Sequence, residues 1–284
     1  MFKDNFSRYE FKFPMTYHDM DCLIGDMKEY VAPDENANAE GYYTISSIYM
    51  DNDAKQCYYE TINNDYFRQK VRLRVYGRKN DENATSFLEI KGKIDGLVVK
   101  RRVKMVLKDA MAFVDACVKK GYGFDLSDFK SSNPQILGEI RQVIVSKNLK
   151  NVNVVSYDRL PYVCRNDPDL RITFDFNIRT RGEDLDLTHG TYGKRTLPER
   201  LAILEVKTSK AIPYWLVKIL GTYGYRNQTF SKYCSHYSPQ KIMLADKSTG
   251  NIHDNGKDNM NNYNPDMKGD CKYEYISGIL DLTF

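Results

Sequence analysis

The chain has 284 residues, of which 42% are hydrophobic and 13% aromatic, enough to bury a sizeable core. Its formal net charge of +4 is only mildly basic and does not by itself indicate a nucleic-acid ligand. No run approaches the ~18 apolar residues of a membrane span, and the N-terminus lacks the apolar core of a signal peptide. The six cysteines are scattered, without a CxxC pair or histidines at ligand spacing, which indicates no zinc site and favours a reducing cytoplasm.

The first expected elements are a short strand and a helix. Alternation along the strand places Arg8, Glu10 and Lys12 on one face. Thr16 is a candidate N-cap for a helix that ends before Pro33, because apolar residues recur at helical spacing between these two positions. The next expected elements are a strand over residues 42–50 and a short helix over 54–61.

Three basic strands follow, over residues 66–77, 87–93 and 97–104. Each run alternates apolar with charged residues, which is the two-residue period of a strand with one dry face. The second face is almost entirely Lys and Arg, with twelve basic against four acidic residues between positions 68 and 104, a local net charge of +8. Like charges on neighbouring strands repel, so this face requires interleaved carboxylates, a wet cavity or a polyanion.

The rest of the chain mixes helices and strands up to about residue 244. We expect helices over 109–120, 134–144 and 213–220, another starting near 230, and strands over 153–159, 161–165, 170–176 and 201–207. From residue 245 the composition is rich in Asn, Asp, Gly and Lys, which cannot bury enough surface to order itself. The prediction is a folded domain over residues 1–244 and a polar, flexible tail over 245–284, with 273–284 a candidate for a final docked strand.

A Glu-x-Lys pattern recurs three times, at Glu10/Lys12, Glu89/Lys91 and Glu205/Lys207. Each places a carboxylate and an ammonium group on the same strand face, about 7 Å apart along the chain. One such pair is ordinary neutralisation on a wet sheet. Three pairs on strands that also carry many arginines favour an antiparallel β-barrel or tunnel with a charged interior, flanked by helices, in an α+β fold. Such an interior is stable only if it stays wet or holds a charged ligand.

An excess of Lys and Arg selects a polyanion, because arginine forks match phosphate oxygens and lysines supply point charges. A minority of carboxylates suits Mg²⁺ or Mn²⁺, so the set indicates phosphoryl transfer. No P-loop or kinase signature is present. Nucleic-acid binding is disfavoured because Phe67, Tyr76 and Phe87 are expected at strand ends or on the apolar face, not among the basic side chains.

Eight short motifs give the chain a resemblance that covers about residues 6–241. They are Arg8-Tyr9-Glu10-x-Lys12, Val71-Arg72-Leu73-Arg74-x-Tyr76, Leu88-Glu89-Ile90-Lys91-x-Lys93, Lys100-x-Arg102, Tyr157-x-Arg159, Arg171-x-Thr173-x-Asp175, Leu204-Glu205-Val206-Lys207 and Phe230-Ser231-Lys232-Tyr233. In this order they resemble the VTC domain, the catalytic domain of the vacuolar transporter chaperone polyphosphate polymerase. That domain belongs to the CYTH-like triphosphate tunnel metalloenzymes.

The resemblance implies a polyphosphate polymerase that transfers the γ-phosphate of ATP onto a growing inorganic polyphosphate chain. The implied catalytic residues, which grip phosphates, are Lys12, Arg72, Arg74, Lys91, Arg159, Arg171 and Lys232. Lys93, Lys100, Arg102, Tyr157, Lys207 and Ser231 are the implied substrate-binding residues. Glu205, Glu89 and Glu10 are the implied ligands of Mn²⁺ or Mg²⁺. ATP and polyphosphate are the expected partners, with no nucleic acid, and a membrane partner encoded separately is compatible with the prediction.

One departure bears on the choice of reaction. Relatives that hydrolyse triphosphate or cyclise ATP carry Glu-x-Glu-x-Lys in the first strand, and the first Glu is Arg8 here. Replacing a metal-binding carboxylate by a cation favours holding a long polyanion over hydrolysing a short one. Two alternatives stay open: a metal-dependent tripolyphosphatase or nucleoside triphosphatase, and a non-catalytic module that binds polyphosphate or inositol phosphate. Glu205 distinguishes the non-catalytic module from the two enzymes, because a protein that only binds polyphosphate does not need this metal ligand.

Overall fold

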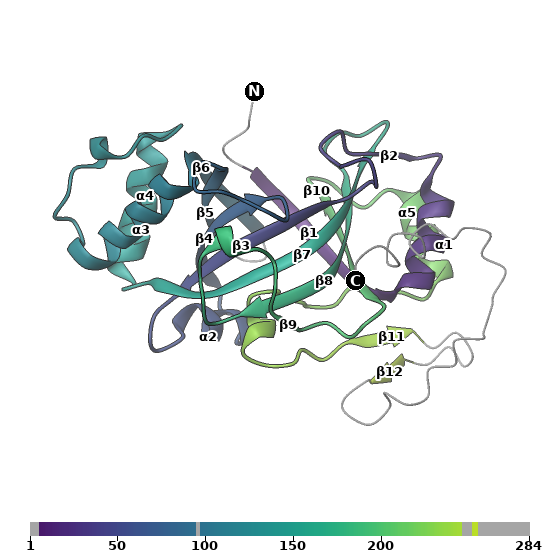
Figure 1. Cartoon of the computed structure of the whole chain (residues 1–284). Coiled ribbons are helices and arrows are strands. Elements are labelled where there is room, and N and C mark those ends of the chain that lie inside the picture. Colours follow the sequence, from purple (N-terminus) through teal and green to yellow (C-terminus); the bar gives the residue numbers. More distant parts are fainter. Residues whose placement is uncertain (1–5, 95–96, 246–251, 255–284) are drawn as a thin grey trace.

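The computed structural model describes residues 6–94, 97–245 and 252–254, and its centre is one antiparallel sheet of ten strands (Figure 1). The strands are β1 (Phe6–Thr16), β2 (Val31–Pro33), β3 (Tyr43–Asp51), β4 (Phe67–Tyr76), β5 (Thr85–Ile94), β6 (Leu97–Val106), β7 (Lys150–Cys164), β8 (Arg171–Arg181), β9 (Lys194–Arg195) and β10 (Leu201–Thr208). Their order in the sheet is β2-β7-β3-β4-β5-β6-β1-β10-β8-β9. The expected α+β fold with an antiparallel sheet and flanking helices is confirmed.

The strand pairings run in a ring. β7 pairs with β3 on one side and with β8 on the other, so the succession β7-β3-β4-β5-β6-β1-β10-β8 returns to β7. The shortest junction in this ring joins β1 to β6 through three residue pairs, from Phe6 opposite Lys100 to Arg8 opposite Val98. One face of the sheet is therefore turned toward the inside of the ring, and the other face is turned toward the helices.

Helices cover the apolar face at two opposite ends of the molecule (Figure 1). At one end lie α3 (Leu107–Lys120) and α4 (Pro134–Ser146), and at the other lie α1 (Tyr17–Met27) and α5 (Tyr214–Thr222). The remaining helices are α2 (Gln56–Ile62) and the short 3-10 helices η1 (Leu126–Asp128), η2 (Leu187–His189) and η3 (Cys234–His236). As predicted, Thr16 caps α1, with its hydroxyl oxygen accepting the Asp19 N–H at 3.1 Å. Each pair of helices closes one of two separate hydrophobic cores.

The core beneath α3 and α4 shows how the alternating pattern is used. Leu73, Leu88 and Val103 lie side by side on β4, β5 and β6 and are at most 1% exposed. Phe113 of α3 is fully buried in the same core. Burying side chains of this size stabilises the fold by about 1.5–3 kcal/mol each. The charged residues between these positions are consequently held on the opposite, inner face.

Three expectations about the elements need correction. The helix expected to continue to Pro33 ends at Met27, and Val31–Pro33 form β2. Residues 153–159 and 161–165 form one strand, β7, because Pro161 falls where the pairing with β3 has already ended, so its missing N–H breaks no ladder bond there. The helix expected near residue 230 is the short η3. In the predicted tail, β11 (Met243–Ala245) pairs with β12 (Ile252–Asp254), whereas the candidate strand over 273–284 lies outside the described residues.

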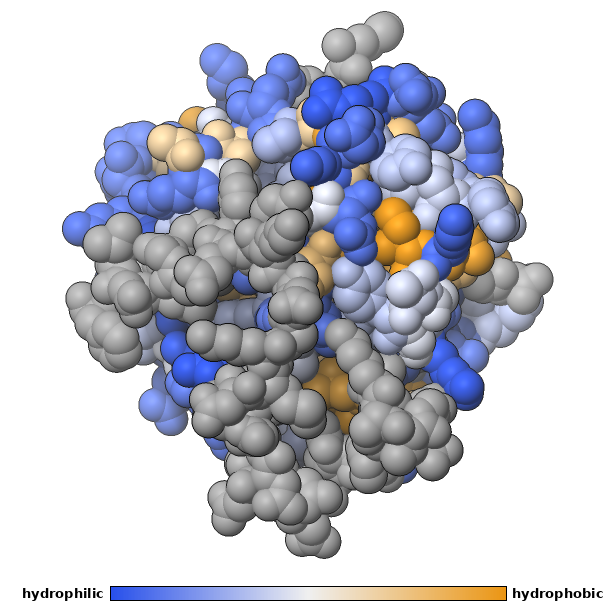
Figure 2. Space-filling view, turned by 90° about the vertical axis from the view of Figure 1, so that its right-hand side faces the viewer, coloured by the Kyte–Doolittle hydropathy of each residue, from blue (hydrophilic) through white to orange (hydrophobic). Residues whose placement is uncertain are grey.

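The surface over α1 and α5 is mostly hydrophilic, with a small apolar area among polar side chains (Figure 2). On α5 the exposed large hydrophobic residues are Tyr214 and Val217. Within the part of the chain that the structure describes, no helix is long and apolar enough to cross a membrane.

Candidate functional site

The inner face of the ring carries a dense set of ionisable side chains. Arg74 of β4 donates a hydrogen bond to the Tyr157 hydroxyl on β7 at 3.3 Å, across the intervening β3. Lys91 of β5 donates to both carboxylate oxygens of Glu10 on β1 at 3.0 and 2.7 Å, across the intervening β6. Contacts that skip a strand are possible only on a concave face. The alternation seen in the sequence has therefore placed these charges inside the ring.

The first buried ion cluster is centred on Glu89. This fully buried carboxylate accepts from Arg72 Nε at 2.6 Å and pairs with Lys100. Burial alone would raise the pKa of Glu89, but Arg72 and Lys100 hold it well below its usual value. Burial lowers the pKa of Lys100 to about 7 in spite of its pairing with Glu89. The carboxylate in this cluster is fully committed to two cations.

The second buried ion cluster joins charged side chains of β7, β8 and β10 with Lys232, which lies outside the strands, around two carboxylates. Arg159 grips Asp175 through two hydrogen bonds of 2.5 and 2.7 Å, and Lys232 pairs with the same carboxylate at 2.5 Å. Both cations also lie 3.5 Å from Glu205, which pairs with Lys207 at 2.8 Å. Despite burial, Asp175 and Glu205 raise the pKa of Lys232, so this ammonium stays charged.

Three further cations of the inner face have only neutral hydrogen-bond partners among the described residues. Lys12 Nζ donates to the Phe230 carbonyl at 2.6 Å, and Lys70 Nζ donates to the Ser231 hydroxyl at 3.4 Å. Arg74, which is 5% exposed, donates to Tyr157 and to the Ser47 hydroxyl at 3.3 Å. Burial lowers the pKa of Lys12 to about 8. None of the three forms an ion pair with a described carboxylate, although Glu205 stands opposite Lys12 and, despite burial and the neighbouring Arg72, the pKa of Arg74 is raised. Cations that are left over from the ion pairs of an interior are the property expected of an anion-binding site.

Not every predicted residue belongs to the buried clusters. Arg171 is half exposed and lies 3.7 Å from Asp34, so it stands at the edge of the site. Lys93 lies opposite Arg68 at the end of β5, and burial followed by the repulsion from Arg68 lowers its pKa. The guanidinium of Arg102 lies 5.0 Å from the centre of the Phe87 ring.

The expectation about aromatic residues was wrong for Phe87, whereas Tyr76 lies at the end of β4, as expected. Both lie in phase with the charged positions of β4 and β5, and Arg74 lies 6.0 Å from the Tyr76 ring centre. The two rings contact each other edge to face at 5.8 Å. The alternation that places Glu89 and Lys91 on the inner face therefore also places Phe87 there.

Sequence reasoning also missed three contributors. Lys70 shares the phase of Arg72 on β4, so the same alternation could have found it. Asp175 was recognised on the polar face of its strand but given no role, although it holds both Arg159 and Lys232. Tyr49 had no distinguishing signal: its hydroxyl accepts from Arg72 at 3.1 Å, and although burial opposes the shift, Arg72 and Arg74 lower its pKa to about 8.

The three predicted metal ligands do not form one group. Among the described residues there is no cluster of three or more His, Cys, Asp or Glu side chains suited to a metal ion. Glu10 and Glu205 are diagonal neighbours on paired strands, since Glu10 stands opposite Lys207 and Glu205 opposite Lys12. Burial would raise the pKa of Glu10, but Lys91 holds it at about 2, so it is an ionised oxygen donor. Two carboxylates fit an ion such as Mg²⁺ that completes its shell with substrate phosphates and water.

The family model of the VTC domain matches residues 7–239. No curated protein matches the chain. Among solved structures, the chain is similar to a putative adenylate cyclase from Bacillus halodurans, at 11% identity and a TM-score of 0.49, over 81% of this chain and 96% of that one. It is also similar to a putative adenylyl cyclase from Hippeastrum with a dominant triphosphatase activity, at 16% identity and a TM-score of 0.45, over 80% and 93%.

Proposed function

Because the chain belongs to the VTC domain family, we propose that it is a polyphosphate polymerase that transfers the γ-phosphate of ATP onto a growing inorganic polyphosphate chain. The family match supports a polyphosphate-related enzyme, and the polymerase reaction is the specific part of the proposal. A cytoplasmic location is a further prediction, and a membrane partner encoded separately is compatible with it.

The observation that carries the proposal is the set of buried and half-buried cations that form no ion pair with a described carboxylate. Lys12, Lys70 and Arg74 face the interior with only carbonyl or hydroxyl partners. A chain of phosphates would supply the missing negative charge at several positions at once. Arginine forks bind phosphate oxygens in two-point contacts, whereas lysines act as point charges that tolerate a sliding chain.

Phosphoryl transfer requires little covalent chemistry from the protein, so positioning and charge neutralisation carry most of the catalysis. We assign Arg72, Arg74 and Lys12 to the phosphates that react, because they lie on facing strands of the interior. Asp175 fixes Arg159 and Lys232 in place, so their positive charges are already positioned before substrate binds. Fixed charges of this kind need no reorganisation when charge shifts between the attacking and leaving oxygens.

For the metal, the residues that fit are Glu205 and Glu10. A bound Mn²⁺ or Mg²⁺ would neutralise and bridge phosphate oxygens. Glu205 would hold the ion from β10 and Glu10 from β1, each exchanging part of its contact with a lysine. Glu89 is better assigned to positioning Arg72 and Lys100, because both cations already contact it.

The test is to incubate the purified protein with ATP and Mn²⁺ and to resolve the products by size. The same assay is run on Glu205→Gln, on Arg74→Ala and on a control, Arg165→Ala, which removes an exposed arginine after β7. Long phosphate chains made by wild type and control, and lost in the other two, are the expected result. Orthophosphate without chains would favour the hydrolase, and tight polyphosphate binding without turnover would favour the binding module.

A further inference from the structure

A second polar cluster lies on the outer face of the sheet, between the two helix-covered cores. Asp158 lies between Tyr157 and Arg159 in β7, so its side chain points away from the inner site. Its carboxylate accepts from the Thr44 hydroxyl at 2.6 Å and from the Asn177 amide at 3.1 Å. Polar residues here replace the apolar ones that cover this face elsewhere.

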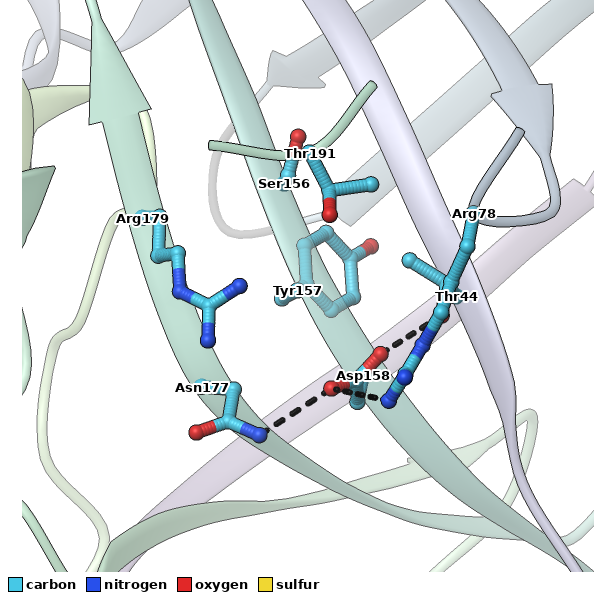
Figure 3. Close-up of a pocket in the computed structure, with 8 residues that line it drawn as sticks. All are labelled: Thr44, Arg78, Ser156, Tyr157, Asp158, Asn177, Arg179 and Thr191. Carbon is cyan, nitrogen blue, oxygen red and sulfur yellow. Dashed lines mark hydrogen bonds and ion pairs between the residues drawn. The ribbon is translucent and has the colours of Figure 1, made fainter. Parts of the chain in front are cut away.

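These residues line a cavity of about 100 Å³ (Figure 3). Its lining residues are Thr44, Arg78, Ser156, Tyr157, Asp158, Asn177, Arg179 and Thr191. The space is well above the roughly 10–15 Å³ that a single water needs, yet small enough to favour one compact ligand. Two arginines against one aspartate leave the lining with a net positive charge.

The two arginines reach the cavity from opposite sides (Figure 3). Arg78, beyond β4, lies 3.7 Å from Asp158 and helps to compensate that carboxylate. Arg179 of β8 is half-buried, its guanidinium points toward the middle of the pocket, and it has no hydrogen bond or ion pair with any described residue. The cavity also contains the Asp158 carboxylate and the Asn177 side-chain oxygen, but neither accepts from Arg179. A half-buried guanidinium that faces a cavity and has no acceptor of its own is poised to bind an anion.

The roof of the cavity is held rigidly in place. The 7% exposed Arg181 donates hydrogen bonds of 2.6–3.2 Å to four carbonyls of the loop that carries Thr191. These carbonyls belong to Asp184, Asp186, Gly190 and Tyr192. Gly193 then passes so close to β8 that a Cβ atom there would lie 2.7 Å from the Thr180 carbonyl oxygen. Thr191 is thus presented to the cavity by a loop that is already ordered.

We propose that this outer pocket binds one tetrahedral oxyanion, with inorganic phosphate as the ligand. The guanidinium of Arg179 would donate to two of its oxygens, and the Thr191 hydroxyl would donate to another. Arg78 would add charge from the opposite side. The pocket shares Tyr157 with the inner face, but its charged residues, Arg78, Asp158 and Arg179, have no part in the proposed polymerase site, so this inference does not depend on that proposal.

The test is equilibrium dialysis of the full chain against radiolabelled inorganic phosphate. Arg179→Gln should weaken one class of phosphate sites by at least about tenfold, because a charge-assisted hydrogen bond is lost. Arg165→Gln, which removes an exposed arginine, should bind as the wild type does. Arg74→Gln should weaken only phosphate bound at the inner face and leave the Arg179-dependent class intact.

Thr191→Val is a second variant, which removes the hydroxyl and preserves the shape of the side chain. It should weaken phosphate binding at the same class of sites, and it keeps the test valid if Arg179→Gln does not fold. ATP turnover, measured on the same samples, should be unchanged by Arg179→Gln. Phosphate binding that is identical in wild type, Arg179→Gln and Thr191→Val would overturn the proposal. If the wild type makes no polyphosphate, the proposed polymerase reaction is wrong, but the proposed phosphate site is not affected, because dialysis measures phosphate binding independently of turnover.

Discussion

The inner face contains two kinds of buried cation. Arg72, Arg159 and Lys232 are held by carboxylates, whereas Lys12 and Arg74 contact only carbonyl or hydroxyl oxygens. The first kind fixes the shape of the interior, because a buried charge whose partner is removed is left uncompensated. The second kind forms no ion pair in the unliganded protein, so a bound polyanion can supply its charge partner. The comparison predicts that mutations in the two groups will separate folding from binding.

The largest effect is expected from Asp175→Ala. This change leaves Arg159 and Lys232 with only the more distant Glu205, so the free energy of unfolding should fall by about 3–5 kcal/mol. Urea unfolding followed by circular dichroism measures it. The matched control is Asp128→Ala, an exposed aspartate in η1, which should change stability by less than about 0.5 kcal/mol. Equal stability of the two variants would remove the structural role assigned to Asp175.

Arg74→Ala should show the opposite behaviour. Its guanidinium has no carboxylate partner, so polyphosphate synthesis should fall by about 10²-fold or more while stability changes little. Removing one of two neighbouring arginines also relieves the repulsion between Arg72 and Arg74. The rate of polyphosphate synthesis and the midpoint of urea unfolding, measured on one preparation, give the loss of activity and the change in stability. A loss of folding as large as that of Asp175→Ala would show that Arg74 is structural.

The pH dependence of binding sharpens the same contrast. Burial lowers the pKa of Lys12 to about 8 and that of Lys100 to about 7. Both lose their charge as the pH rises, so affinity for tripolyphosphate should fall between about pH 7 and about pH 9. The free energy of unfolding of the free protein should rise over the same pH range. Between the lowered pKa of each lysine in the folded protein and its ordinary pKa in the unfolded chain, the unfolded chain binds more protons, so raising the pH favours the folded state. Calorimetric titration checks the first trend and urea unfolding the second.

A Lys12→Arg variant supplies the control for this pH profile. Arginine keeps its charge throughout the range, so the fall in affinity with pH should become shallower. A profile identical to that of the wild type would assign the titration to another group.

The smallest effect is expected from Tyr49→Phe. Its hydroxyl accepts from Arg72 at 3.1 Å, and Glu89 continues to hold the same guanidinium. Turnover should therefore fall only a few-fold, in line with the loss of about 1 kcal/mol of hydrogen bonding. Steady-state kinetics beside Arg74→Ala would measure it, and a loss as large as that of Arg74→Ala would give Tyr49 a direct role.

Alternation along single strands was sufficient to predict which side chains share the inner face. Arg72, Arg74 and Glu89 are where the two-residue period places them, because one face of each strand has to meet the helices. Alternation carries no information about register between strands distant in sequence. It therefore could not show that Lys91 reaches Glu10 across β6, or that Asp175 ties β8 to Lys232.

The same limit explains the uncertain metal ligands and the outer pocket. The sequence grouped Glu89 with Glu205 through a shared motif, although Glu89 contacts Arg72 and Lys100 and Glu205 contacts Lys207. The outer pocket draws its lining from β3, β7, β8 and two loops, and none of these segments has a distinctive pattern alone. Such sites arise from tertiary placement and became visible only in the structure.

The most direct test of the central claim is the balance of phosphate after complete turnover of ATP by the wild type. A polymerase should release ADP with little orthophosphate, and the missing phosphate should be recovered as acid-stable chains that Arg74→Ala fails to make. Equal amounts of ADP and orthophosphate, with no chains at any time, would contradict the account and identify the inner site as a hydrolase.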